Sequence, residues 1–181
     1  MQSTPARRRC KKGAEESELS AEEMKKKEGI GLSRGGKNTK IHAVVDGLGN
    51  PVKLTFTEGN VSDSKEAVPI LEKVSEKVDI SGSTILGDKA YGSKEIREFI
   101  ESVGAYYCIP PKTNAKEPWE VDYYHYKERH LVECFFNKLK QFRHIATRYD
   151  KLLSRFKSFV FLASVIILCK YHNLFCFSDT L

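Results

Sequence analysis

The charged residues of the segment 126–140, "YKERHLVECFFNKLK", recur at helical spacing. At about 100° per residue, four polar side chains fall within roughly 60° of one another on a helix: Tyr126, Arg129, Glu133 and Lys140. The apolar residues of the same segment lie on the other side and can enter a core. The polar face presents a carboxylate between two cations, which suits contact with phosphate and metal ions. It is equally consistent with a solvated helix face on which Arg129 and Glu133 form an i, i+4 ion pair.

A second carboxylate, Asp88, follows the short apolar run "STILG", which predicts a buried strand ending at this residue. Phosphoryl transfer on nucleic acids commonly uses two divalent metals about 3.5–4 Å apart, held by carboxylates from different elements. Mg²⁺ needs only one or two carboxylates per ion, because waters and phosphate oxygens fill its other positions. Asp88 and Glu133 are therefore candidate metal ligands. An Asp that ends a strand is also a common turn former, so its position alone leaves both roles open.

The elements around these residues alternate between strand and helix. Residues 39–59 predict a β-hairpin around Asp46, residues 61–78 a helix with an Asp or a Ser as its cap, Asp63 being the Asp, and residues 83–87 a strand. A helix over 94–104, a strand over 105–109 and long helices after Trp119 follow. This order predicts a mixed α/β fold with a central sheet and flanking helices.

Composition narrows the partners and the compartment. The 181 residues carry a net charge of +6 and are 40% hydrophobic, which suits one compact domain. Between residues 129 and 157 there are eight basic residues against two acidic ones, which favours contact with phosphate. Five cysteines without a C-x-x-C pair indicate a reducing cytoplasm, and the scattered histidines predict no zinc site. The longest apolar run, twelve residues between Lys157 and Lys170, is too short to cross a bilayer and predicts a buried C-terminal helix.

The spacing Y-x-x-R-x-x-x-E-x-x-x-x-x-x-K resembles the signature of bacterial insertion-sequence DDE transposases of the large IS-four and IS-five groups. The blocks "SRGGKNTKIHAVVDGLGNPV", "EGNVSDS", "LGDKAYGS" and "IPPK" are similar to that family's in the same order, over roughly residues 31–155. The resemblance implies a ribonuclease H-like fold, a bacterial cytoplasmic setting at the nucleoid, and metal-dependent cleavage and strand transfer at transposon ends and target DNA.

Residue by residue, the resemblance makes Asp88 and Glu133 ligands of Mg²⁺ or Mn²⁺, with Arg129 and Lys140 on DNA phosphate. Tyr126 would orient the helix or stack near the DNA strand end, and simple packing explains it as well. The loop residue Arg34, in "SRGG", would clamp a phosphate or belong only to a turn.

The family's first catalytic Asp, in a D-S-T-like motif, falls on Gln2, which is followed by Ser3 and Thr4. A glutamine offers a neutral oxygen, so the third carboxylate is absent at its expected place. We therefore expect a charged flexible arm over 1–30, a partial ribonuclease H-like domain over 31–155 with its first strand largely missing, and an apolar helix over 156–181 packed on it.

The missing first strand and first carboxylate predict that the chain is a truncated or second-reading-frame part of a transposase. We expect such a chain to be inactive alone and poorly soluble. Its partner would be the upstream transposase segment, because the strands "TKIHAVVD" and "STILG" would flank the missing strand. Two alternatives stay open: a non-catalytic DNA-binding remnant, and an inhibitor that forms mixed complexes with a full-length transposase.

Overall fold

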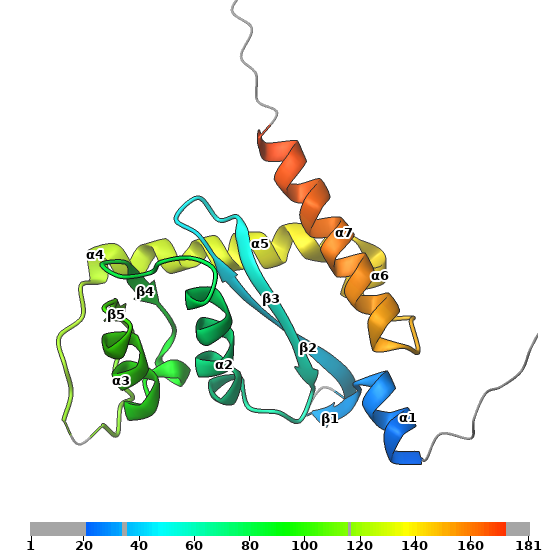
Figure 1. The fold of residues 1–181 in the computed structure, drawn as a ribbon, viewed down its shortest axis with the longest axis horizontal. Helices are drawn as coiled ribbons and strands as arrows, with labels where there is room; N and C mark the ends of the chain where they lie inside the picture. Colours follow the sequence, from blue (N-terminus) through cyan, green and yellow to red (C-terminus); the bar gives the residue numbers. More distant parts are fainter. Residues whose placement is uncertain (1–20, 34–35, 116, 173–181) are drawn as a thin grey trace, which may run out of the picture.

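The computed structural model describes residues 21–33, 36–115 and 117–172, and these form a mixed α/β fold (Figure 1). Strands β1 (Gly31–Ser33), β2 (Gly36–Val45) and β3 (Pro51–Glu58) make an antiparallel sheet in the order β1-β2-β3. The β2–β3 turn is fixed by Asp46, whose Oδ1 accepts hydrogen bonds from the Leu48 and Asn50 amides, both at 2.9 Å. The predicted hairpin and the turn role of Asp46 are confirmed.

A second sheet pairs β4 (Thr84–Leu86) with β5 (Tyr106–Cys108) in parallel. Parallel strands need a crossover connection, and here it contains the 3₁₀ helix η1 (Lys89–Tyr91) and the helix α3 (Lys94–Ser102). Gly104, at φ 71°, provides the left-handed turn between α3 and β5. The predicted order of strand, helix and strand is therefore confirmed.

Helix α2 (Asp63–Ser75) is shorter than the predicted 61–78, and of the two predicted cap types the Ser is found at the N-cap position, whereas the assignment of the cap to Asp63 is wrong. Ser62 holds the N-cap position without a side-chain cap bond, and Asp63 is the first helical residue. Its carboxylate instead accepts the Lys40 ammonium from β2 at 2.9 Å. This ion pair ties the start of α2 to the hairpin.

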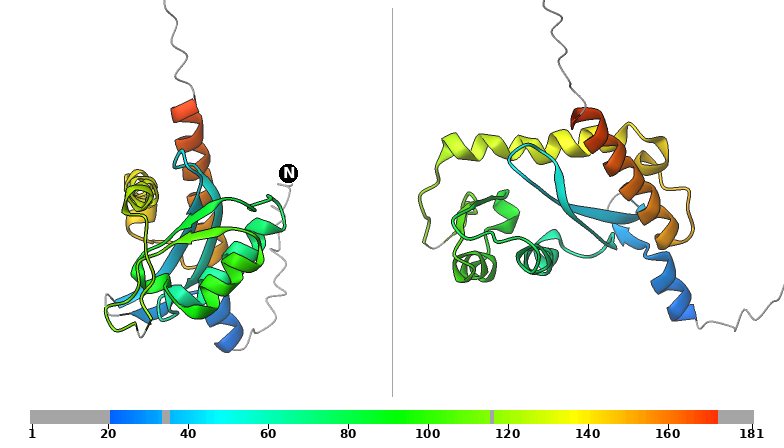
Figure 2. Two further views of the ribbon diagram at one scale, coloured as in Figure 1. Left: turned by 90° about the vertical axis from the view of Figure 1, so that its left-hand side faces the viewer. Right: turned by 45° about the horizontal axis from the view of Figure 1, so that its top comes forward.

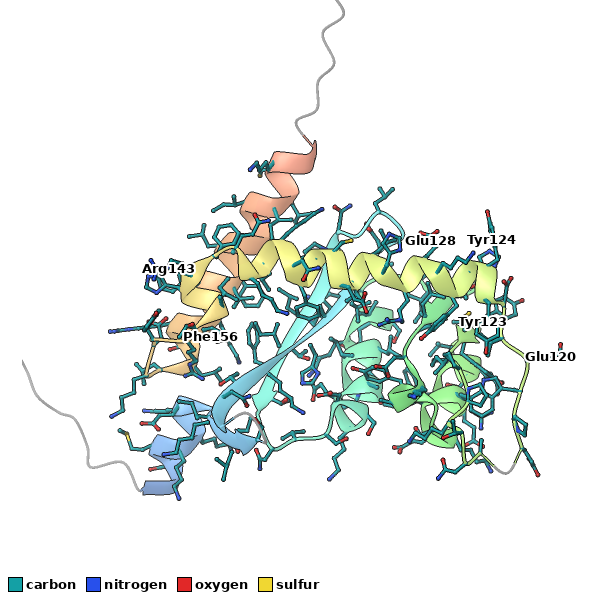
Figure 3. All side chains as sticks on the ribbon, turned by 180° about the vertical axis from the view of Figure 1, so that it is seen from behind. Glu120, Tyr123, Tyr124, Glu128, Arg143 and Phe156 are labelled. Carbon is teal, nitrogen blue, oxygen red and sulfur yellow. The ribbon has the colours of Figure 1, made fainter. Side chains whose placement is uncertain are left out.

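The predicted helix over 126–140 is divided in three: α4 (Tyr123–Tyr126), the 3₁₀ turn η2 (Lys127–Arg129) and α5 (His130–Lys140). Together they form one long rod that runs from Tyr123 and Tyr124, past Glu128, toward Arg143 (Figure 3). The remaining helices are α1 (Ala21–Glu28), α6 (Arg143–Ala146) and α7 (Leu153–His172). None of the helices in the described part of the chain combines the length and apolarity that a membrane crossing requires.

The strands lie between two helical layers, with α5 on one side and α2 and α3 on the other (Figure 2). Each side has its own hydrophobic cluster. The first joins Leu54 to Phe135 and Leu139 of α5 and to Phe156 and Val160 of α7. The second is built largely by α2 and α3 together with the residues around β5: Ala67, Ile70, Leu71, Ile96, Ile100, Ala105 and Ile109. Alternate residues of β2 serve the two clusters, as strand geometry requires.

Candidate active site

A cavity of about 640 Å³ lies between the hairpin strand β2 and the short strand β4. Three of the predicted site residues line it: Asp88, Arg129 and Glu133. They come from two separate parts of the chain, the end of β4 and the η2–α5 rod. The fold therefore brings together residues that are far apart in sequence and whose chemistry suggested a common site.

Asp88 lies immediately beyond β4 and is the N-cap of η1. Its Oδ1 accepts a hydrogen bond from the Ala90 amide at 2.7 Å, which satisfies one donor at the start of that turn. Asp88 therefore does have the turn-forming role that was one of its two readings from the sequence. The same cap fixes the carboxylate at the rim of the cavity, so the two roles are compatible.

Arg129 and Glu133 form the predicted i, i+4 pair: the guanidinium Nη2 donates to Glu133 Oε1 at 2.6 Å. Burial by itself lowers the pKa of Arg129, but the hydrogen bond and charge of Glu133 outweigh it, with help from Tyr126 and Asp88, so the pKa is raised overall. The charge of Asp88 is the smallest of these contributions to the pKa of Arg129. The Arg129 guanidinium also lies 5.8 Å from the centre of the Tyr126 ring, a cation–π geometry.

The other predicted residues are placed differently. Lys140 is exposed and lies two helical turns beyond Glu133, about 10 Å along α5, outside the cavity lining. Tyr126 is half-buried and contacts Arg129, but it does not line the cavity. Arg34 and Gln2 lie outside the described residues.

Sequence reasoning missed Tyr91, which lines the cavity three residues after Asp88. Burial, followed by the charges of Asp63 and Asp88, raises the pKa of its phenol to about 12. Tyr91 is therefore a protonated hydrogen-bond donor at neutral pH. The signal was its place in "LGDKAYGS", on the 3₁₀ turn that Asp88 caps.

His42 of β2 also lines the cavity and was not singled out from the sequence. Its Nε2 lies 2.7 Å from Thr57 Oγ1 on the neighbouring strand. Burial lowers the pKa of His42, against opposing contributions from Asp63 and Glu66. The imidazole is therefore neutral over a wider pH range than a free histidine.

The cavity is lined by oxygen donor atoms of the type that bind a hard cation such as Mg²⁺. Asp88 and Glu133 supply carboxylate oxygens, the ligands that Mg²⁺ and Mn²⁺ prefer. In the described part of the chain, no cluster of three or more His, Cys, Asp or Glu side chains is arranged to hold a metal ion. Because Mg²⁺ needs only one or two protein carboxylates, the residue types present are compatible with such an ion, whose other ligands would be water and phosphate oxygens.

The basic residues after Arg129 are not all available to a nucleic acid. Arg148 donates from Nε to the Asp150 carbonyl at 2.9 Å and from Nη2 to the Glu28 carbonyl at 2.6 Å. It also donates to Thr39 Oγ1 of β2. Arg148 therefore ties three segments of the protein together, while exposed Lys140 and Arg155 face solvent.

Comparison with known proteins defines the class. The family model described as "Transposase DDE domain" matches residues 6–119, a span that includes Asp88 and ends before Glu133. The chain belongs to the DDE transposase family, and the resemblance found in its motifs is confirmed.

The comparison also found an individual relative of the chain. A Brucella ovis protein named as a transposase for insertion sequence element IS6501 is 39% identical over 132 residues, which cover 71% of this chain and 96% of that protein. No solved structure matches the chain.

Proposed function

We propose that this chain is the ribonuclease H-like catalytic part of an insertion-sequence transposase and acts on DNA by phosphoryl transfer. The observation that carries the proposal is the convergence of Asp88, Arg129 and Glu133 on one cavity from elements 45 positions apart (133 − 88). The order of elements, antiparallel strands followed by helix, strand, helix and strand, supports the fold assignment. The DNA substrates would be the transposon ends and the target.

Asp88 and Glu133 would hold Mg²⁺ or Mn²⁺. When bound, such ions stabilise the attacking and leaving oxygens of an in-line displacement at phosphorus. Arg129 holds the Glu133 carboxylate in one orientation through the 2.6 Å hydrogen bond. Tyr91, protonated at neutral pH, can donate a hydrogen bond to a phosphate oxygen inside the cavity. Lys140 extends the positive surface two turns along α5, where it would contact the DNA backbone.

The resemblance places the family's third carboxylate at Gln2, which is no carboxylate and lies outside the described residues. We therefore propose that the chain alone is inactive and that a further transposase segment completes the site. Arg34 stays a predicted phosphate contact, and Tyr126 is assigned to support of Arg129.

A second candidate is DNA binding without catalysis. The observation in its favour is that both carboxylates already have structural partners, Asp88 in a helix cap and Glu133 in an ion pair. In this case the basic residues of α5 would bind phosphate and no metal would be required.

Calorimetric titration with Mn²⁺ separates the two candidates. Catalysis predicts weak binding by the wild-type chain and loss of the binding heat in Asp88→Asn and Glu133→Gln. The matched control is Glu128→Gln, since Glu128 is exposed and lines the same cavity. Isotherms for Asp88→Asn and Glu133→Gln that match the wild type would remove both residues from a metal site and leave the DNA-binding candidate.

A further inference from the structure

A second pocket, of about 490 Å³, lies between helix α3 and the segment that follows β5. The charged side chains among the described residues that line it are three basic ones and one acidic one: Lys94, Arg97, Lys112 and Glu117. None of the four lines the cavity of the candidate active site. Lys94 lies 3.4 Å from Glu98, but both side chains are mostly exposed, and such pairs are weak. The pocket is therefore positively charged, and the proposed function gives this charge no role.

Two aromatic rings hold the Arg97 guanidinium in place. It lies 3.9 Å from the centre of the Trp119 ring and 5.6 Å from the centre of the Tyr107 ring. The two rings stand at 88° to each other, with their centres 6.1 Å apart. Trp119 is itself fixed, because its Nε1 donates to the Ile109 carbonyl at 2.7 Å. Stacking on a ring positions a guanidinium through its face and leaves the N–H donors along its edge free.

Arg97 has no acidic partner in the part of the chain that the structure describes. Its Nε is buried without a hydrogen-bond partner, and no described residue accepts a hydrogen bond from its terminal nitrogens. Arg129 and Arg148, by contrast, both donate to acceptors of the protein. Charged groups that are withdrawn from water are usually paired, because an unpaired one costs free energy. A half-buried, unpaired guanidinium beside a pocket is therefore suited to receive an anion.

We propose that this pocket is a second phosphate-binding site, in which the Arg97 guanidinium donates to phosphate oxygens and Lys94 and Lys112 add positive charge. The planar fork of an arginine matches two phosphate oxygens at once. A phosphate group offers three oxygens and about two negative charges, so it suits three surrounding cations better than a carboxylate does. The site requires neither a metal nor the cavity, so it goes beyond the proposed phosphoryl transfer.

The pocket lies close to the cavity along the chain. Gly92 lines the pocket, whereas Asp88 and Tyr91, on the same turn, line the cavity. The four residues from 88 to 92 span at most about 15 Å. If the proposed function holds, a DNA strand that enters the cavity can place a neighbouring backbone phosphate in the pocket. The other source of the same group is a free phosphate compound.

Trp119 is the single tryptophan of the chain, so its fluorescence reports on this pocket. Inorganic phosphate, added at constant ionic strength, should change the fluorescence of the wild-type chain to saturation, whereas acetate and chloride should not. Arg97→Gln should lower the phosphate affinity at least about tenfold, because hydrogen bonds to a charged group are lost. Arg97→Lys keeps the charge but not the fork of donors, and should lose most of the same affinity.

Two further variants keep the test specific. Lys112→Gln removes an exposed charge of the pocket, leaves the Arg97–Trp119 stack in place, and should lower the affinity about two- to fivefold. Arg155→Gln removes an exposed arginine of α7 and should leave the affinity unchanged. Circular dichroism checks that each variant keeps the wild-type fold. If Arg97→Gln does not fold, Lys112→Gln decides, and wild-type affinity in that variant would then contradict the proposal.

Three results would overturn the phosphate site: no response of the wild-type chain to phosphate, an equal response to acetate, or wild-type affinity in a folded Arg97→Gln protein. Duplex DNA separates the two sources of phosphate. If a DNA backbone supplies it, Arg97→Gln should reduce the slope of log DNA affinity against log salt by about one unit. An unchanged slope beside a clear phosphate response would assign the pocket to a free phosphate compound. The Mn²⁺ titration is separate from both measurements, so this site and the proposed function can fail independently.

Discussion

Replacement of Arg148 should destabilise the protein without changing its affinity for DNA. Its guanidinium bridges α1 and β2, through the Glu28 carbonyl at 2.6 Å and the Thr39 hydroxyl, and it lies 5.1 Å from the Phe156 ring centre. Hydrogen bonds to a charged group contribute about 1.5–3 kcal/mol each. Arg148→Ala removes two such long-range bonds. Because their partner groups are only half-buried and can bind water once the arginine is gone, the free energy of unfolding should fall by about 2–3 kcal/mol and not by the full sum.

Urea unfolding followed by circular dichroism measures this cost. Arg148→Lys keeps the charge but not the planar fork of donors, so it should lose most of the same stability. Arg155→Ala removes an exposed arginine from α7 and is the matched control. A free energy of unfolding for Arg148→Ala within about 0.5 kcal/mol of the wild type would refute the bridging role. A weaker salt dependence of DNA binding in Arg148→Ala would refute its assignment to the fold alone.

Three further predictions concern separate parts of the molecule. Arg129→Ala combined with Lys140→Ala should reduce the slope of log affinity against log salt by about two units, measured by fluorescence anisotropy on duplex DNA, and an unchanged slope would mean that neither side chain neutralises a phosphate. Burial lowers the pKa of His42 in the folded protein, so as the pH falls the unfolded chain protonates at this residue before the folded protein does. The free energy of unfolding should therefore decrease as the pH falls from 6.5 through the lowered pKa. His42→Gln should weaken this pH dependence, measured by urea unfolding at several pH values. Phe135→Ala should cost about 3–5 kcal/mol in the same assay, because Phe135 is 1% exposed in the first hydrophobic cluster, and a loss below about 1 kcal/mol would show that the cluster repacks.

Local patterns in the sequence were enough to predict the two hairpin strands, β4, β5, the crossover helix and the hairpin turn, whereas the short strand β1 was not predicted. Asp46 and the glycines at 47 and 49 indicated the hairpin turn, and apolar spacing indicated the buried face of α5. What the sequence did not reveal depends on contacts between distant residues. Asp63 looks like a helix cap until Lys40, 23 positions earlier (63 − 40), is folded against it.

The candidate site shows the same division. Helical spacing was enough to predict the Arg129–Glu133 pair, and the end of a strand was enough to single out Asp88. The participation of Tyr91 and the internal role of Arg148 were not predictable in this way. Both depend on which elements enclose them, because burial and partner atoms decide whether a phenol or a guanidinium faces a ligand or the protein.

The two hydrophobic clusters have a consequence for the cooperativity of unfolding. They share no buried residue, and β2 is the strand whose alternate side chains reach both, Ala43 toward the first and Val44 toward the second. Parts of a protein whose buried side chains do not contact each other often open as separate cooperative units. We therefore expect the α5–α7 side and the α2–α3 side to open as two separate units, joined through the β2–β3 hairpin that both sides contact.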